Sequence, residues 1–250
     1  MITPTGTQQK RHSEKDAELY HLMEATFSDS PISLLDKLEA FPRFASKRSI
    51  ARFLAKQKIF EKIIGINGIV VECGVFNAGG LFTWAMLSEI YEPTNYNRKI
   101  VGFDTFEGFP NVHKEDQNDI ASPSVGELRG DTFDSISRSI YKHNHERYLS
   151  HIEKISLVRG DFMETSTLYL NANPHVLISL LYLDFDLYEP TCQALETFLP
   201  RMPKGAIVCF DELNCPNFPG ETTALLEKVN IRTHCIERLP IDPWISWLVL

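Results

Sequence analysis

A glycine-rich turn follows an apolar run at residues 69–80, IVVECGVFNAGG. The run is short and almost continuously apolar, which is typical of a strand buried on both faces of a parallel sheet. The glycines that follow allow the backbone to turn sharply into a helix. We therefore expect a strand from Ile69 to Val75 and, after the turn, a helix over residues 81–90.

The same pattern repeats along the rest of the chain. Four more apolar runs, each ending in a small or acidic residue, lie at residues 99–105, 155–161, 180–186 and 206–212. Segments with helical spacing lie between runs, for example at residues 132–149 and 189–199. Strands that alternate with helices in this way predict right-handed crossovers and a doubly wound α/β fold.

Two last strand-like runs, at residues 233–238 and 244–250, have no clear helix between them. They predict an antiparallel hairpin that completes a mostly parallel, seven-stranded, Rossmann-like sheet. The segment from Phe106 to about Gly130 is long, irregular and rich in Asp, Glu, Asn, Pro and Gly. Irregular segments of that length are usually functional or disordered.

The chain ahead of the sheet divides into two parts. Residues 1–18 are polar, and we expect them to be flexible, whereas the spacing of apolar residues from Pro31 to Ile64 predicts helices. We expect residues 1–64 to form a flexible N-terminus and a helical lid, and residues 65–250 to form the catalytic domain. Between Arg43 and Lys62 the lid has seven basic residues and one acidic residue, which favours an anionic substrate or, alternatively, a solvated helix face.

Composition and charge exclude several classes of protein. The 250-residue chain is 43% hydrophobic and 23% charged, as in an ordinary globular protein, and its formal net charge of −8 disfavours a nucleic-acid partner. The five cysteines include no CxxC pair, which indicates reduced thiols. No run has the length of a membrane span or the pattern of a signal peptide. We expect a cytoplasmic protein with a small-molecule partner and no membrane partner.

Acidic residues stand at the end of every predicted parallel strand, where ligands bind in folds of this class. They are Glu72, Asp104, Asp161, Asp184, Asp186, Asp211 and Glu212. Capping of the following helices and compensation of their dipoles are the alternative explanation, above all for Asp186 and for Glu189. The first turn lacks the GxGxxG spacing of dinucleotide sites, whereas glycines and carboxylates suit the cationic groups and the ribose of S-adenosylmethionine.

Five strings carry a resemblance to a known family. They are VECGVFNAGG (71–80), IVGFDTFEGFP (100–110), VRGDF (158–162), LYLDFDLYEPT (181–191) and AIVCFDELNCPNFPG (206–220). In this order the chain resembles the macrocin O-methyltransferase family of sugar methyltransferases over roughly residues 45–240. The resemblance implies a class I methyltransferase fold, S-adenosylmethionine as methyl donor, a divalent cation such as Mg²⁺, and a homo-oligomer.

The resemblance also implies the roles of individual residues. It implies that the metal is held by Asp184, Asp211 and Glu212, and that Asp184 is the catalytic residue. It assigns to the cofactor Glu72, Gly74, Val75, Phe76, Asn77, Gly79, Gly80, Asp104, Thr105, Asp161, Phe162 and Asp184. The chain departs from the family at Phe76-Asn77-Ala78, where antibiotic-pathway members often have a basic or aromatic residue, and at Glu212, where the family often has Asp or Asn.

The expected reaction is methyl transfer to a hydroxyl of a sugar that is free, nucleotide-linked or within a glycan, in a natural-product or surface-polysaccharide pathway. Alternative bases are His113 and His175, and an alternative acceptor is a catechol-like phenol. The spacing Asp184-Phe-Asp186 also matches the DxD of many glycosyltransferases, and a module that has lost activity is a third possibility.

Overall fold

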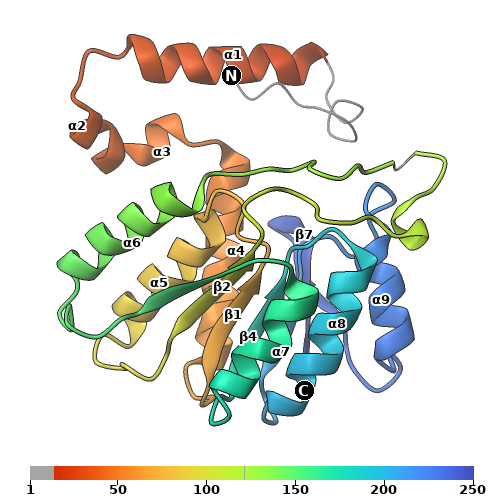
Figure 1. Ribbon diagram of the computed structural model, residues 1–250. Coiled ribbons are helices and arrows are strands. Elements are labelled where there is room, and N and C mark those ends of the chain that lie inside the picture. The colour runs from red at the N-terminus through yellow and green to blue at the C-terminus, as the bar shows by residue number, and fades with distance from the viewer. Residues whose placement is uncertain (1–13, 121) are drawn as a thin grey trace.

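The structure, a computed structural model, describes residues 14–120 and 122–250. Its centre is one seven-stranded sheet with the order β3-β2-β1-β4-β5-β7-β6 (Figure 1). The strands are β1 (Ile69–Cys73), β2 (Ile100–Asp104), β3 (Ile155–Arg159), β4 (Ile178–Leu183), β5 (Ile207–Phe210), β6 (Glu237–Leu239) and β7 (Asp242–Val249). The first five strands pair in parallel, and β7 runs antiparallel to β5 and β6. The predicted fold class and the closing hairpin are confirmed.

Helices cover both faces of the sheet. Two short 3₁₀ helices also occur, η2 (Lys114–Asp116) between β2 and α6 and η3 (Leu199–Arg201) between α8 and β5. The helices are α1 (Glu14–Asp29), α2 (Leu34–Glu39), α3 (Phe41–Phe44), α4 (Lys47–Ile63), α5 (Gly79–Tyr91), α6 (Phe133–Glu146), α7 (Phe162–Ala172), α8 (Tyr188–Phe198) and α9 (Gly220–Lys228). None of the described helices is long and apolar enough to cross a membrane.

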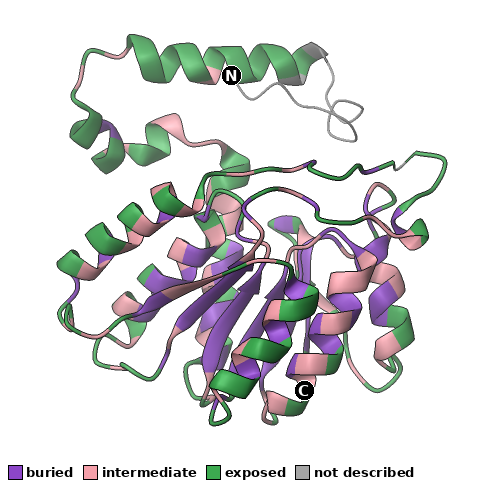
Figure 2. Cartoon of the chain, in the orientation of Figure 1, coloured by how far each residue is buried: buried purple, intermediate pink, exposed green. Residues whose placement is uncertain are grey.

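The sheet has two cores because neighbouring residues of a strand point to opposite faces. Val70 packs in the core under α4, α5 and α6, whereas Val71 packs in the core under α7, α8 and α9. Figure 2 shows the strands buried along most of their length. The strand order reverses at β1, which lies between β2 and β4. Ligands of doubly wound folds bind at that reversal, beyond the carboxyl ends of the strands.

The N-terminal helices differ from the rest of the chain in their exposure. Helices α1 to α3 stand beside the sheet domain and join it through α4 (Figure 1). Phe27 of α1 packs edge-on against Phe44 of α3, with ring centroids 5.3 Å apart. Leu34, Leu35 and Leu38 of α2 are more than 60% exposed. The helices predicted between Pro31 and Ile64 are thus confirmed. The prediction of a flexible segment is wrong for residues 14–18, which begin α1, and its remainder, residues 1–13, lies outside the described residues.

Candidate active site

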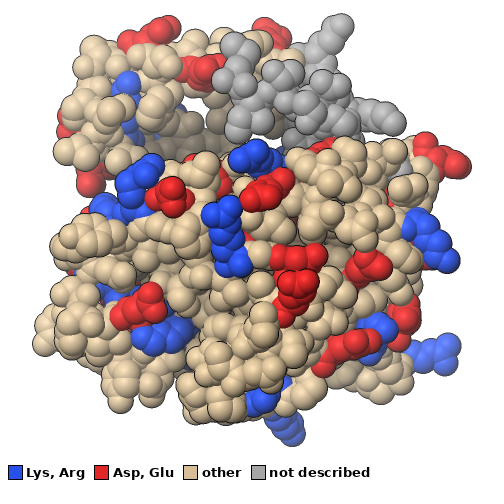
Figure 3. All heavy atoms as spheres, viewed as in Figure 1, with Lys and Arg blue, Asp and Glu red and all other residues tan. Residues whose placement is uncertain are grey.

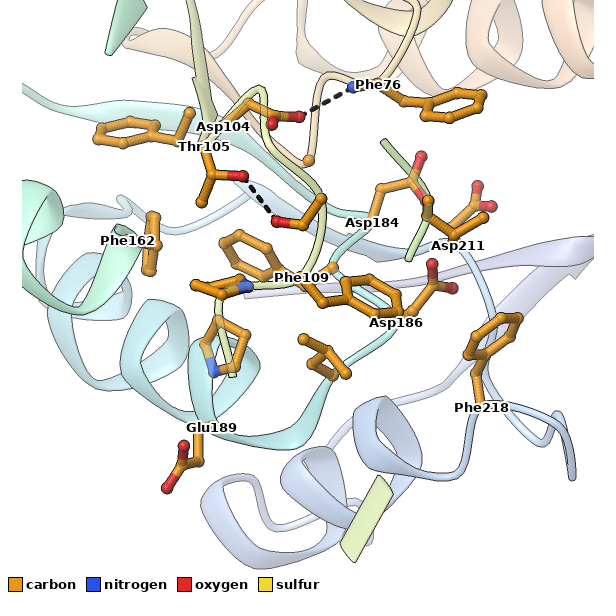
Figure 4. Close-up of a pocket in the computed structure, with 18 of the residues that line it drawn as sticks. Phe76, Asp104, Thr105, Phe109, Phe162, Asp184, Asp186, Glu189, Asp211 and Phe218 are labelled. Atoms are coloured by element: carbon orange, nitrogen blue, oxygen red, sulfur yellow. Dashed lines mark hydrogen bonds between the residues drawn. The ribbon is translucent and has the colours of Figure 1, made fainter. Parts of the chain in front are cut away.

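A cavity of about 380 Å³ opens where the strand order reverses. Its wall is built from the turns that follow β1, β2, β3, β4 and β5, together with helix α4 and the long segment after β2 (Figure 4). Each of these turns contributes at least one residue to the wall, in chain order Gly74, Asp104, Asp161, Asp184 and Asp211. A cavity of this volume is in the range of small-molecule sites.

The turn after β1 is packed so tightly that only glycine fits at its start. Gly74 has φ +91°, and a Cβ atom there would lie 2.0 Å from the carbonyl oxygen of Asp184. Backbone amides of the same turn point at Asp104: Val75 N and Phe76 N donate to its Oδ2 at 2.7 and 2.9 Å (Figure 4). Phe106 N donates to Oδ1 at 2.6 Å. Asp104 therefore joins the β1 and β2 turns on the cavity wall.

Glu72 lies behind that wall. Its side chain is 2% exposed and belongs to the α5 side of the sheet, because it alternates with Val71. Burial raises its pKa to about 7, and the charge of Lys56 opposes that rise. A Cβ atom on Gly80 would lie 2.4 Å from a Glu72 carboxylate oxygen, so Glu72 fills the space under the first turn of α5.

Carboxylates crowd the ends of β4 and β5. Asp184, Asp186, Asp211 and Glu212 all line the cavity. The pKa of Asp184 is raised mainly by burial and next by repulsion from Asp211. The pKa of Asp186 is raised mainly by burial and next by repulsion from Glu212. Asp186 does not cap α8, whose N-cap residue is Leu187 and has no side-chain hydrogen bond. Capping of α8 by Asp186 is therefore wrong. Compensation of the α8 dipole by Asp186, and by Glu189 in the first turn of the helix, stays a prediction.

Two cations stand against these carboxylates. Arg52 of α4 is ion-paired with Asp211, and the buried hydroxyl of Tyr182 donates to the other oxygen of Asp211. Burial lowers the pKa of Arg52, but the charges of Asp211, Tyr182 and Asp184 and the hydrogen bond to Asp211 together outweigh burial and raise that pKa. Lys56, one turn further along α4, places its Nζ atom 3.4 Å from the centre of the Tyr182 ring. Helix α4 thus supplies positive charge to the acidic strand ends.

A buried acid outside the predicted set connects the two acidic turns. Glu221, at the start of α9, is 0% exposed. Its two oxygens accept from Asp186 N at 3.3 Å and from Glu212 N at 3.2 Å. Burial and the charges of Asp184 and Asp211 raise its pKa. Sequence reasoning missed this residue because Glu221 follows a loop and ends no strand.

The predicted site residues divide into two groups. Those on the cavity wall are Gly74, Phe76, Asp104, Thr105, Asp161, Phe162, Asp184, Asp211 and Glu212. Those that do not line it are Glu72, Val75, Asn77, Gly79 and Gly80. Strand alternation turns Glu72 toward α5, and α5 begins at Gly79 and carries the chain away from the cavity. Asp161 combines two roles, since it lines the cavity and also caps α7 by accepting from Met163 N at 2.9 Å.

The two histidines considered as bases lie in different places, and only His113 is at the cavity. His113 lines the cavity and stacks on Tyr188, with ring centroids 5.0 Å apart. His175 is exposed and precedes β4, so it lies at the amino end of the sheet, opposite the cavity. The suggestion that His175 acts as a base is therefore wrong. His113 accepts from Glu115 N at Nδ1, at 3.2 Å.

One side of the cavity is apolar, which sequence reasoning did not predict. Phe109 and Phe218 line it and pack together with Leu187 and Cys215. Both phenylalanines stand in strings that carried the family resemblance, FDTFEGFP and NCPNFPG. Such a wall suits the carbon-bound faces of a ring that also presents polar groups to the acids.

The acids at the ends of β4 and β5 have the chemistry of a hard-cation site. Carboxylate oxygens are the ligands that Mg²⁺ prefers, and their mutual repulsion would be relieved by a cation. Within residues 14–120 and 122–250, however, no three His, Cys, Asp or Glu side chains converge as a metal-ligand group. Asp211 is instead paired with Arg52 and Tyr182.

Comparison with known proteins gives a consistent result. The model of a family described as Macrocin-O-methyltransferase (TylF) matches residues 41–233, which is more than half of the chain. A Streptomyces olivaceus protein named 8-demethyl-8-(2,3-dimethoxy-alpha-L-rhamnosyl)-tetracenomycin-C 4'-O-methyltransferase is 28% identical over 59% of this chain. The demethyldecarbamoylnovobiocin O-methyltransferase of Streptomyces niveus is 25% identical over 62% of it. The matches span only 54% and 58% of those two relatives.

Solved structures extend the likeness over the whole chain. CalS11, described as a calicheamicin methyltransferase, is 30% identical, with a TM-score of 0.90 over 100% of this chain and 99% of its own. Its apo structure, described as a TDP-rhamnose 3'-O-methyltransferase, gives a TM-score of 0.82 over 95% of both chains. The O-methyltransferase NovP, at 23% identity and a TM-score of 0.62, shares the fold. The N-terminal helices are thus part of the fold that CalS11 and this chain share.

Proposed function

The chain belongs to the macrocin O-methyltransferase family, and we propose that it transfers a methyl group from S-adenosylmethionine to a hydroxyl group of a sugar. The observation that carries this proposal is the cavity at the reversal of strand order, where the β1 turn, Asp104 and the acids after β4 and β5 meet. The family match favours methyl transfer over the glycosyl transfer that the spacing of Asp184 and Asp186 would also allow. It favours a working enzyme over a module without activity.

The cofactor residues on the wall suit the groups of S-adenosylmethionine. Gly74 permits close approach of the ligand to the backbone of the first turn. The Asp104 carboxylate accepts hydrogen bonds from three backbone N–H groups. Because a carboxylate has about four acceptor positions, it can accept one more hydrogen bond, from a ribose hydroxyl. We propose that Thr105, Asp161 and Phe162 border the nucleoside. Glu72, Val75, Asn77, Gly79 and Gly80 act indirectly in this proposal, by supporting the turn.

Methyl transfer needs an acceptor oxygen that is aligned and nucleophilic. The new bond joins that oxygen to the methyl carbon as the bond from carbon to sulfur breaks, and S-adenosylhomocysteine leaves. We propose that Asp184 takes the hydroxyl proton, since burial and Asp211 raise its pKa and make it a stronger base. His113 lies on the same wall and is the alternative base.

We further propose that a divalent cation, Mg²⁺ in the first instance, binds Asp184, Asp211 and Glu212. The crowding of carboxylates with raised pKa values supports this, because a cation relieves their repulsion. A bound cation would lower the pKa of the acceptor hydroxyl. Arg52 and Tyr182 would then have to share or release Asp211.

The acceptor class comes from the relatives and the cavity together. One relative is named for a rhamnosyl-tetracenomycin and CalS11 for TDP-rhamnose, which supports a sugar hydroxyl, free, glycosidic or nucleotide-linked. The apolar wall of Phe109 and Phe218 suits one face of a sugar ring. We propose a cytoplasmic homo-oligomer, and the exposed leucines of α2 support the association of subunits.

The test is incubation with S-adenosylmethionine labelled with ¹³C in the methyl group and a panel of sugars, nucleotide sugars and catechols. We expect a new methoxy signal in the NMR spectrum of a sugar compound and no signal with Asp184→Asn. Methylation of catechols alone would overturn the sugar acceptor. Failure to bind S-adenosylmethionine would overturn the methyltransferase function itself.

A further inference from the structure

Two arginines of α4 reach the cavity. Arg48 and Arg52 are four residues apart, which places them on the same face of the helix, and both line the cavity wall. Figure 3 shows basic and acidic side chains side by side near the middle of the face, below the N-terminal helices. Arg52 is committed to Asp211. Arg48 is exposed and has no hydrogen bond or ion pair with the residues that the structure describes.

The other basic residues of the lid have different surroundings. Arg43 lies over the Phe44 ring at 5.0 Å, and Lys56 is buried on the Tyr182 ring. Lys58 pairs with Glu61, and Lys62 lies 3.9 Å from Glu237. Lys47 precedes Arg48 and is exposed, but it does not line the cavity. Among the seven basic residues from Arg43 to Lys62, Arg48 alone combines a place on the cavity wall with an uncommitted charge.

An uncommitted guanidinium on the wall of an acidic cavity calls for an anionic ligand. The methyl donor carries a sulfonium and an ammonium, which suit the acids, and one carboxylate, which is the rival anion for Arg48; a neutral sugar offers no negative charge. A phosphate group attached to the sugar matches the fork of an arginine. The exposed position of Arg48 would keep such a phosphate at the open end of the cavity, away from Asp184 and Asp211.

An aromatic side chain accompanies this charge. Phe76 lines the cavity and is 42% exposed, so part of its ring is accessible to a ligand. In Figure 4 its ring points away from Asp104, toward the side where Asp184 and Asp211 lie. A free aromatic face of this kind stacks readily on a nucleobase.

We propose that Arg48 binds the diphosphate of a nucleoside diphosphate sugar and that Phe76 provides a stacking face for its base, so that the acceptor is methylated while it is nucleotide-linked. This inference rests on the proposed methyltransferase function. It assigns both residues to acceptor affinity, and so differs from the family resemblance, which assigned Phe76 to the methyl donor.

Calorimetry with TDP as the probe, in the presence of saturating S-adenosylhomocysteine, tests the assignment. We expect Arg48→Gln to weaken TDP binding at least tenfold and to flatten its dependence on salt, whereas Arg48→Lys retains part of the affinity. Lys47→Gln removes the same charge from the neighbouring position and should change TDP affinity less than twofold. Phe76→Ala should weaken binding of TDP more than that of inorganic pyrophosphate.

Three results would overturn the inference. One is TDP binding that is no tighter than thymidine binding in the wild-type protein. Another is equal TDP affinity in Arg48→Gln and Lys47→Gln. The third is loss of S-adenosylhomocysteine affinity in Arg48→Gln, which would assign the arginine to the cofactor carboxylate. If the wild-type protein bound TDP but no S-adenosylhomocysteine, the proposed methyltransferase function would fail instead.

Discussion

Arg52 of helix α4 is ion-paired with Asp211, which follows strand β5 and lies 159 positions further along the chain. The Asp211 side chain is 4% exposed and that of Arg52 is 28% exposed. The pair therefore attaches the N-terminal helical segment to the acidic end of the sheet. The positive charge of Arg52 also offsets the negative charge of Asp211 at the cavity wall.

Replacement of Arg52 by Gln should destabilise the protein. Loss of one partner leaves a buried charge unpaired, which typically costs about 3–5 kcal/mol, and the partial exposure of Arg52 reduces the expected loss to about 2–3 kcal/mol. The urea midpoint measures this loss. The control is Lys58→Gln on the same helix, where the pair with Glu61 is on the surface and little change is expected. Equal midpoints for both variants would show that the pair contributes nothing to folding.

Asp104→Asn tests the support of the first turn. One amide nitrogen would replace a carboxylate oxygen that now accepts from backbone N–H groups, so donor would face donor. We expect the affinity for S-adenosylhomocysteine to fall at least ~10-fold, equivalent to about 1.4 kcal/mol. Glu107→Gln, on the exposed part of the next turn, should leave it unchanged. Unchanged affinity in Asp104→Asn would remove Asp104 from the cofactor site.

Glu72 should make stability depend on pH. Its pKa is raised from 4.5 to about 7 in the folded protein, so the folded state holds the proton more tightly than the unfolded chain does. This group therefore favours folding most at low pH, and on the order of 3 kcal/mol is lost as pH rises from about 4.5 to 7. Thermal unfolding of Glu72→Gln and wild type should diverge in the variant's favour as pH rises from 5 to 8. A constant difference in Tm over that range would contradict the prediction.

Asp184→Asn should separate catalysis from binding. The substitution keeps the shape of the side chain and removes both a base and a ligand charge, so we expect kcat to fall at least ~10²-fold. Affinity for S-adenosylhomocysteine should change less than about threefold, since the carboxylate acts on the acceptor in this mechanism. Glu189→Gln, also on the cavity wall, serves as the control and should retain most activity. Normal turnover of Asp184→Asn would favour His113 as the base.

Removal of divalent cations should stop the reaction. We expect EDTA to abolish turnover and added Mg²⁺ to restore it. Asp211→Asn should raise the Mg²⁺ concentration needed for half-maximal activity. Full activity in EDTA would reject the proposed metal and leave the protein-based mechanism through Asp184 or His113.

The sheet and its acidic edge could be predicted from the sequence, because buried parallel strands are continuous apolar runs and their ends carry the polar groups. The apolar runs do not show, however, which face of the sheet the acidic residue near each strand end points to. Glu72 illustrates this: it stands in the right turn, yet strand alternation places it under α5 and off the cavity wall. Helix α1 was not predicted because it leaves Leu19, Tyr20 and Leu22 exposed and forms no apolar stripe.

Long-range pairs were also beyond the sequence. Nothing in the spacing of residues joins Arg52 to Asp211, or Glu221 to Asp186 and Glu212, because those contacts depend on how α4 and α9 pack on the sheet. The basic composition of the lid did indicate charge near a ligand. The structure restricts that charge on the cavity wall to Arg48 and Arg52.

The proposed methyl transfer is tested most directly by calorimetric titration of the wild-type protein with S-adenosylhomocysteine. We predict saturable binding of one molecule per chain, displaced competitively by S-adenosylmethionine. The absence of saturable binding at millimolar ligand, in protein whose cooperative unfolding shows that it is folded, would contradict it.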